Sequence, residues 1–187
     1  MKRIVILISF MAALALCASA QTYIDFSDMA MVKTPWPMPD NYPSGMYMNW
    51  DNFYYVTAGI WAGEGPGFQV LPTPKTVAFL GGPMCDIRIP CHASIKLIGP
   101  NVAAFTPVSI QVAAGWLPSR VVVSAYSNGK FLGHTVWNLT TDLQTLSFPN
   151  AWSDLTEITF IPEFVPTNSN YPKAGSLVIY KLAVMMH

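Results

Sequence analysis

Residues 121–133 read Val-Val-Val-Ser-Ala-Tyr-Ser-Asn-Gly-Lys-Phe-Leu-Gly, and they carry the strongest local signal in this chain of 187 residues. Asn128 and Gly129 supply the two residues of positive φ that a tight type I′ turn requires. The β-branched and aromatic residues on both sides of this turn favour extended strands. We therefore predict two adjacent antiparallel strands, Arg120 to Tyr126 and Lys130 to Val136.

The period-two pattern of this hairpin recurs in short apolar runs that are separated by Pro, Gly and Asn, without a long stretch of helical periodicity. Further strands are predicted at Tyr23 to Met29, Tyr47 to Val56, Thr76 to Leu80, Ser94 to Ile98, Val108 to Ala113, Gln144 to Phe148, Glu157 to Ile161 and Ser176 to Met185. About ten strands require two packed sheets, because a single sheet would leave one apolar face in water. The expected fold class is all-β, a two-sheet antiparallel β-sandwich of the jelly-roll type.

Proline-rich and turn-rich segments predict the connections between these strands. Thr34 to Pro43 cannot hold a sheet interior, because each proline removes a ladder donor and fixes φ. We also expect connections at Trp137 to Thr141 and at Asn150 to Asp154.

The N-terminus has the three parts of a secretory signal peptide. Lys2 and Arg3 form a positive region, an apolar run extends from Ile4 to Leu16, and Ala18-Ser19-Ala20 fits the cleavage pattern. This run is shorter than the roughly 20 apolar residues that span a bilayer. We predict a signal peptide at residues 1–20, one domain at residues 21–187, and release from the cell. An uncleaved anchor or a buried N-terminal helix is the alternative.

Charge is low and evenly spread. The chain has ten Lys and Arg against ten Asp and Glu, and two of the basic residues leave with the predicted signal peptide. Nucleic acids and anionic membranes are held by clustered Lys and Arg, so neither is an expected partner.

Two of the three cysteines remain after the predicted cleavage, because Cys17 lies in the signal peptide. In an oxidising compartment, Cys85 and Cys91 are then expected to form a disulfide. A metal pair is the alternative, although no paired zinc-type spacing of His and Cys is present.

Several segments, taken in order, resemble secreted β-sandwich domains of the galactose-binding-like, carbohydrate-binding-module type. These segments are residues 24–29, 45–53, 121–133, 143–148, 155–160 and 177–184. The resemblance implies a β-sandwich that binds carbohydrate. Many members hold a structural calcium with acids near the first and last strands, which makes Asp25 and Asp28 candidate metal ligands. Tyr180 and Lys181 stand in the closing strand where an acid is often found, so no cofactor is expected and calcium is the alternative.

Candidate ligand-binding residues are tryptophans that lie beside Pro, Gly or Asn in expected loops, namely Trp36, Trp61, Trp116 and Trp152. Exposed rings on a rigid sandwich can stack on the apolar faces of sugars, while polar groups bond the hydroxyls. The alternative is that these rings close the ends of the sandwich as ordinary packing.

Two shorter motifs concern the surface. Because side chains alternate along a strand, Asn49 and Asp51 are expected on a wet face with Trp50 buried on the other. Asn138-Leu139-Thr140 is a glycosylation sequon, which makes Asn138 a candidate modification site in a eukaryotic source.

No motif marks a catalytic site. A glycosidase needs two carboxylates roughly 5 to 9 Å apart across a cleft, which sequence neither gives nor excludes. No nucleophile elbow, phosphate-binding Gly loop or zinc motif is found. The sequence therefore favours a protein without catalytic activity and leaves the question open.

Three functional hypotheses follow. The first is a secreted, non-catalytic protein that recognises carbohydrate of a cell wall or host surface through loop aromatics. The second is a secreted protein-interaction, effector or structural matrix protein that contacts another protein or its own copies, which the ten methionines also fit. The third is a sandwich-fold glycan hydrolase or lyase.

Overall fold

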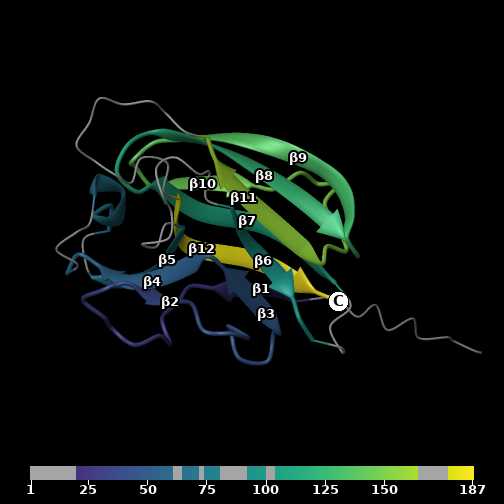
Figure 1. Ribbon diagram of the computed structural model, residues 1–187, viewed down its shortest axis with the longest axis horizontal. Helices are drawn as coiled ribbons and strands as arrows, with labels where there is room; N and C mark the ends of the chain where they lie inside the picture. The colour runs from purple at the N-terminus through teal and green to yellow at the C-terminus, as the bar shows by residue number, and fades with distance from the viewer. Residues whose placement is uncertain (1–19, 61–64, 72–73, 81–91, 100–103, 164–176) are drawn as a thin grey trace, which may run out of the picture.

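The computed structural model describes residues 20–60, 65–71, 74–80, 92–99, 104–163 and 177–187, which form two antiparallel sheets (Figure 1). The seven-stranded sheet has the order β10 (Gln144–Ser147), β7 (Phe105–Ala114), β12 (Leu177–Met186), β5 (Lys75–Leu80), β4 (Phe53–Ala58) and β2 (Trp36–Pro37), with β1 (Gln21–Ile24) paired to the C-terminal half of β12. The five-stranded sheet has the order β3 (Met48–Asp51), β6 (Ala93–Leu97), β11 (Glu157–Pro162), β8 (Ser119–Ser127) and β9 (Lys130–Leu139). A single 3-10 turn, η1 (Pro66–Phe68), is the helical element of the described residues.

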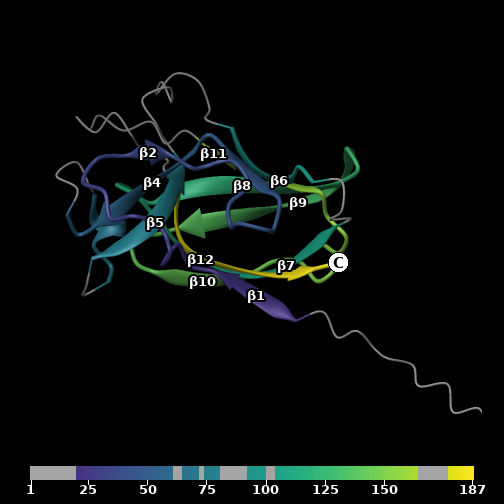
Figure 2. The same cartoon turned by 90° about the horizontal axis from the view of Figure 1, so that it is seen from below.

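The prediction of an all-β, two-sheet antiparallel sandwich is confirmed. Figure 2 shows the two layers, with β6, β8, β9 and β11 in one and β1, β7, β10 and β12 in the other. The structure has twelve strands where about ten were expected, because Tyr47 to Val56 divides into two strands and the proline-rich segment adds the short edge strand β2. In the described part of the chain, no helix has the length and hydropathy needed to cross a membrane.

The predicted hairpin is confirmed, and its register is regular at the turn. Asn128 and Gly129 have φ of 49° and 77°, and Ser127 pairs with Lys130 across them. Between the pairs Ala125–Gly133 and Tyr126–Phe131 the register shifts, so that Leu132 is the extra residue of β9. β9 also continues to Leu139, into the segment that was expected to be a connection.

The chain crosses from one sheet to the other at Asn52, between β3 and β4. Asn52 has a φ of 59°, which Asn tolerates better than most residues, and its Nδ2 donates to the carbonyl of His92 at 2.7 Å. The predicted first strand also ends earlier than expected, at Ile24. After β1 the chain turns, and the N–H of Met29 donates to the carbonyl of Phe26 at 3.2 Å. The backbone N–H and the hydroxyl of Ser27 both donate to Asp25 Oδ1.

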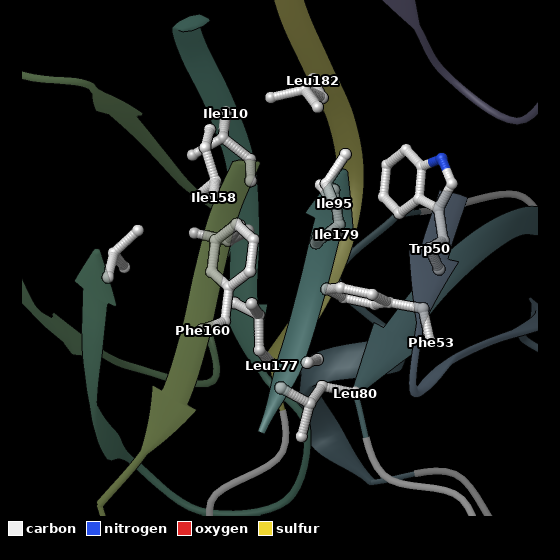
Figure 3. Packing of buried hydrophobic residues seen from close by; sticks show 14 of the residues in the cluster. Trp50, Phe53, Leu80, Ile95, Ile110, Ile158, Phe160, Leu177, Ile179 and Leu182 are labelled. Carbon is white, nitrogen blue, oxygen red and sulfur yellow. The ribbon is translucent and has the colours of Figure 1, made fainter. Parts of the chain in front are cut away.

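The main core lies between the sheets. Figure 3 shows side chains from both layers meeting there, including Ile95, Ile158 and Phe160 from the five-stranded sheet and Ile110, Ile179 and Leu182 from the seven-stranded sheet. Ring contacts cross the same space: the centroids of Trp50 and Phe53 are 5.4 Å apart, and those of Phe53 and Phe160 are 5.8 Å apart. Burial of these large rings on both sheets fixes how the layers stack.

A second hydrophobic cluster covers part of the outer face of the seven-stranded sheet. Phe68 of η1 packs on Phe79 and Trp116, with centroid separations of 5.4 and 5.1 Å. The register of β12 against β7 shifts between Ile179 and Lys181, and the buried hydroxyl of Tyr180, which lies between them, donates to the carbonyl of Gly67 at 2.7 Å. Residues 65–71 therefore hold this sheet face by packing and by hydrogen bonding.

Candidate functional site

The predicted binding tryptophans lie in different environments. Trp36 is 55% exposed on edge strand β2, as expected for a ring available to a ligand. Trp116 and Trp152 are only 6% and 4% exposed, so the expectation that these two rings face solvent is wrong. Trp61 lies outside the described residues.

Trp116 and Trp152 are buried because both rings pack into hydrophobic clusters, Trp116 on the outer face of the seven-stranded sheet and Trp152 in the main core. Trp116 belongs to the second cluster, and Trp152 packs on Phe148 with centroids 6.1 Å apart. Trp152 also borders a cavity of about 210 Å³ whose lining, with Phe148, Pro149 and Met185, is mostly apolar. The Gly, Ser and Asn residues beside Trp116 and Trp152 correctly indicate irregular backbone. They carry no information on whether the tryptophan ring points to solvent or to the core.

The candidate calcium ligands are engaged by protein donors. Asp25 accepts two hydrogen bonds from Ser27, and the side-chain bond is the main cause that lowers the pKa of Asp25 below its ordinary value. Asp28 Oδ1 accepts from the Tyr42 hydroxyl at 2.6 Å. Within the described residues, no group of three or more His, Cys, Asp or Glu side chains gathers in a way that could hold a metal ion.

The predicted alternation around Trp50 is confirmed. Trp50 is buried, and its indole N–H donates to the carbonyl of Tyr42 at 2.7 Å. Asp51 is exposed on the opposite face, where its Oδ1 accepts from Asn49 Nδ2 at 2.8 Å and its Oδ2 accepts from the Ser94 hydroxyl at 3.4 Å. Neighbouring side chains thus hold both oxygens of this exposed carboxylate.

The outer face of the five-stranded sheet carries a row of side chains in continuous register, one from each strand. We call this row the cross-strand track, and its members are Asn49, Lys96, Glu157, Tyr126 and Phe131. All of them are at least partly exposed. Their neighbours along the strands, Trp50, Ile95, Ile158 and Ala125, are buried in the core. Strand alternation therefore points the track away from the core.

The track ends in exposed rings at the hairpin. The centroids of Tyr126 and Phe131 are 5.6 Å apart at an interplanar angle of 58°, and His134 stacks on Phe131 at 6.4 Å and 22°. We call Tyr126, Phe131 and His134 the aromatic patch. Phe131 is 52% exposed, and Leu132 beside it is 42% exposed. The predictions missed this patch, although the Asn128-Gly129 turn alone places Tyr126 opposite Phe131.

A second row of polar side chains runs beside the track in the same register. Its members are Asp51, Ser94, Thr159, Ser124 and His134. The three hydroxyl residues in the middle are buried, whereas Asp51 and His134 at the two ends are exposed. A ligand on this face can therefore reach the polar groups of the track and, from the second row, only those of Asp51 and His134.

The remaining predicted sites fall partly outside the described residues. Cys85 and Cys91 lie outside them, and their disulfide stays a prediction. Asn138 lies in β9 rather than in a connection, and it is exposed opposite Arg120, whose guanidinium pairs with Glu163 at 3.0 Å. The sequon at Asn138 also stays a prediction.

The fold defines the molecule as a two-sheet β-sandwich, and the outer face of its five-stranded sheet is polar and aromatic. Several solved β-sandwich structures are similar to it in fold. A DUF4465 family protein from Bacteroides caccae matches with a TM-score of 0.50 and 11% identity, over 95% of this chain and 97% of that one. A DUF4465 family protein from Bacteroides ovatus matches with a TM-score of 0.50 and 10% identity, over 90% and 94%.

A family 29 carbohydrate-binding module is also similar, with a TM-score of 0.42 and 11% identity over 89% of each chain. At these identities the likeness concerns the fold. The sequence matches no protein-family model and no curated protein.

Proposed function

We propose that this chain is a secreted, non-catalytic protein that binds carbohydrate through the aromatic patch. The observation that carries this proposal is the pair Tyr126 and Phe131, whose rings lie 5.6 Å apart on an accessible sheet face. Sugar rings have apolar C–H faces that pack on aromatic rings, and their hydroxyls need polar partners close by. Glu157 supplies an acceptor directly beside Tyr126 in the register.

The position of these rings on strands supports binding for an energetic reason. Strands β8 and β9 pair along their length, so the rings of Tyr126 and Phe131 have backbones that are already ordered. A ligand then does not have to order a loop, which lowers the cost of association. Exposure of Phe131 and Leu132 together also costs stability in water, and such exposed apolar groups mark interaction sites.

Trp36 is a separate candidate ring. It is the one predicted tryptophan that is exposed in the described residues, and it lies in the other sheet, paired with Tyr55. Trp36 and the aromatic patch are therefore two separate candidate sites. Single substitutions, one at Trp36 and one in the patch, show which of them binds the ligand.

Secretion is the second part of the proposal. Residues 1–20 have the pattern of a signal peptide, and β1 begins at Gln21, the predicted first residue of the mature chain. N-terminal sequencing of the exported protein tests this: a start at Gln21 is expected, and a start at Met1 would contradict it. A Cys85–Cys91 disulfide belongs to the same proposal and is testable by mass spectrometry of the unreduced chain.

Binding is tested by retention of the purified chain on insoluble polysaccharides and on glycan arrays. We expect retention that Phe131→Ala and Tyr126→Ala reduce at least tenfold. Met31→Ala removes an apolar side chain outside the patch that is 65% exposed, against 52% for Phe131, and serves as the matched control. If Trp36→Ala alone abolishes retention, the site is at β2 instead. If no glycan retains the wild-type chain, the proposal fails and the same rings become the candidate contact for a protein partner.

A further inference from the structure

The cross-strand track is longer than a single sugar. Its five members come from five adjacent strands, from Phe131 on edge strand β9 to Asn49 on edge strand β3. Neighbouring strands are about 4.8 Å apart, so the track spans about 19 Å. That distance is several times the width of one pyranose ring. A ligand that used the whole track would be a chain of sugars that crosses the strands.

The end of the track remote from the rings is a prepared polar site. Asn49 Nδ2 donates to Asp51 Oδ1 at 2.8 Å, and the Ser94 hydroxyl donates to Asp51 Oδ2 at 3.4 Å. These bonds fix the direction of the carboxylate, which still has lone pairs for further donors. Sugar hydroxyls are donors of the required kind, so this end fits a hydroxyl-bearing unit rather than an apolar one.

The charges along the track oppose one another. Lys96 and Glu157 are paired in the register at its centre, and Asp51 lies near the end at β3. The nearest basic residue of β8, Arg120, is engaged with Glu163 at 3.0 Å. Recognition of an acidic glycan requires several unopposed basic groups. On β9 the exposed Lys130 lies next to Phe131 along the chain, so the described part of this face adds one basic group to Lys96, which is fewer than such a cluster needs.

We infer that the ligand is an extended, neutral oligosaccharide, which lies across the strands from the aromatic patch to Asn49 and Asp51. This inference rests on the proposed carbohydrate binding. One end of the oligosaccharide packs on Tyr126 and Phe131, its middle passes Glu157 and Lys96, and its other end donates to Asp51.

Isothermal titration calorimetry with cello-, manno- and galacto-oligosaccharides, from monosaccharide to hexasaccharide, tests the inference. For the series that binds, affinity should rise at least tenfold with chain length before it levels off. Asp51→Ala and Asn49→Ala should remove most of that rise and leave the affinity for the shortest ligand unchanged. Phe131→Ala should weaken every length. Asp142→Asn, a change at an exposed acid between β9 and β10, should have no effect.

The outcomes separate this inference from the proposed function. If affinity is already maximal for a monosaccharide or disaccharide, or if the Asp51 and Asn49 variants bind long ligands as tightly as the wild type, the track is not the site. In both cases a loss in Phe131→Ala would leave the proposed function standing. Retention on sulfated or uronic polysaccharides, without retention on neutral ones, would show that the ligand is not neutral. Failure of every glycan would overturn both proposals.

Discussion

Tyr42 is a buried residue that joins the first turn of the chain to the core. Its ring stacks on Phe26 with centroids 5.8 Å apart, and its hydroxyl donates to Asp28 at 2.6 Å. Burial raises the pKa of Tyr42 far above its ordinary value of about 10, and the hydrogen bond to the Asp28 carboxylate raises it further. The folded state therefore keeps this proton at a pH where the unfolded chain loses it.

The sign of the resulting pH dependence follows from linkage. Below about pH 10, Tyr42 is protonated in both states and its hydrogen bond contributes fully. Above about pH 10, only the unfolded state loses the proton, so the free energy of unfolding falls by up to ~1.4 kcal/mol per pH unit through this group. We predict that Tyr42→Phe is less stable than wild type near neutral pH and that the difference shrinks as the pH rises above 10. Urea denaturation of both proteins from pH 8 to pH 11 measures it, and parallel pH curves would contradict it.

Asn52 forms the corner between strands β3 and β4, which belong to different sheets. Its φ is 59°, and its side chain bonds the carbonyl of His92. Ala in a left-handed conformation costs about 1 kcal/mol, and the lost hydrogen bond adds about 1 kcal/mol. We predict that Asn52→Ala lowers the free energy of unfolding by about 2 kcal/mol, whereas Asn52→Gly, which tolerates positive φ, loses about half as much. Equal losses in the two variants, measured by urea denaturation, would mean that φ at this corner is unimportant.

The elements also show which parts of the fold a sequence reveals. The hairpin was predictable because Asn128 and Gly129 specify its turn type locally. The corner at Asn52 was missed: the alternation of Met48 and Trp50 stops at Asp51 and Asn52, but two consecutive polar residues do not by themselves say that the flanking strands belong to different sheets. Within the candidate site, the pair Tyr126 and Phe131 follows from the same turn. The rest of the track was not predictable, because Lys96 and Tyr126, the neighbours of Glu157 in the track, are far from it in the sequence. Their juxtaposition depends on strand register between remote segments, for which a single sequence has no local signal.

The balance of charge over the whole protein determines how its binding should depend on salt. The chain has a formal net charge of zero, and Lys96 and Glu157 oppose each other at the centre of the track. Salt weakens binding in proportion to the charges that a ligand neutralises, and a neutral oligosaccharide neutralises none. We predict less than about a twofold change in affinity for the bound neutral glycan between about 0.05 M and 0.5 M NaCl, measured by calorimetry, and no retention on heparin at about 0.15 M. A steep loss of affinity with salt would show that basic residues dominate recognition. The aromatic patch would then be an accessory to an electrostatic site, because ring stacking alone is insensitive to ionic strength.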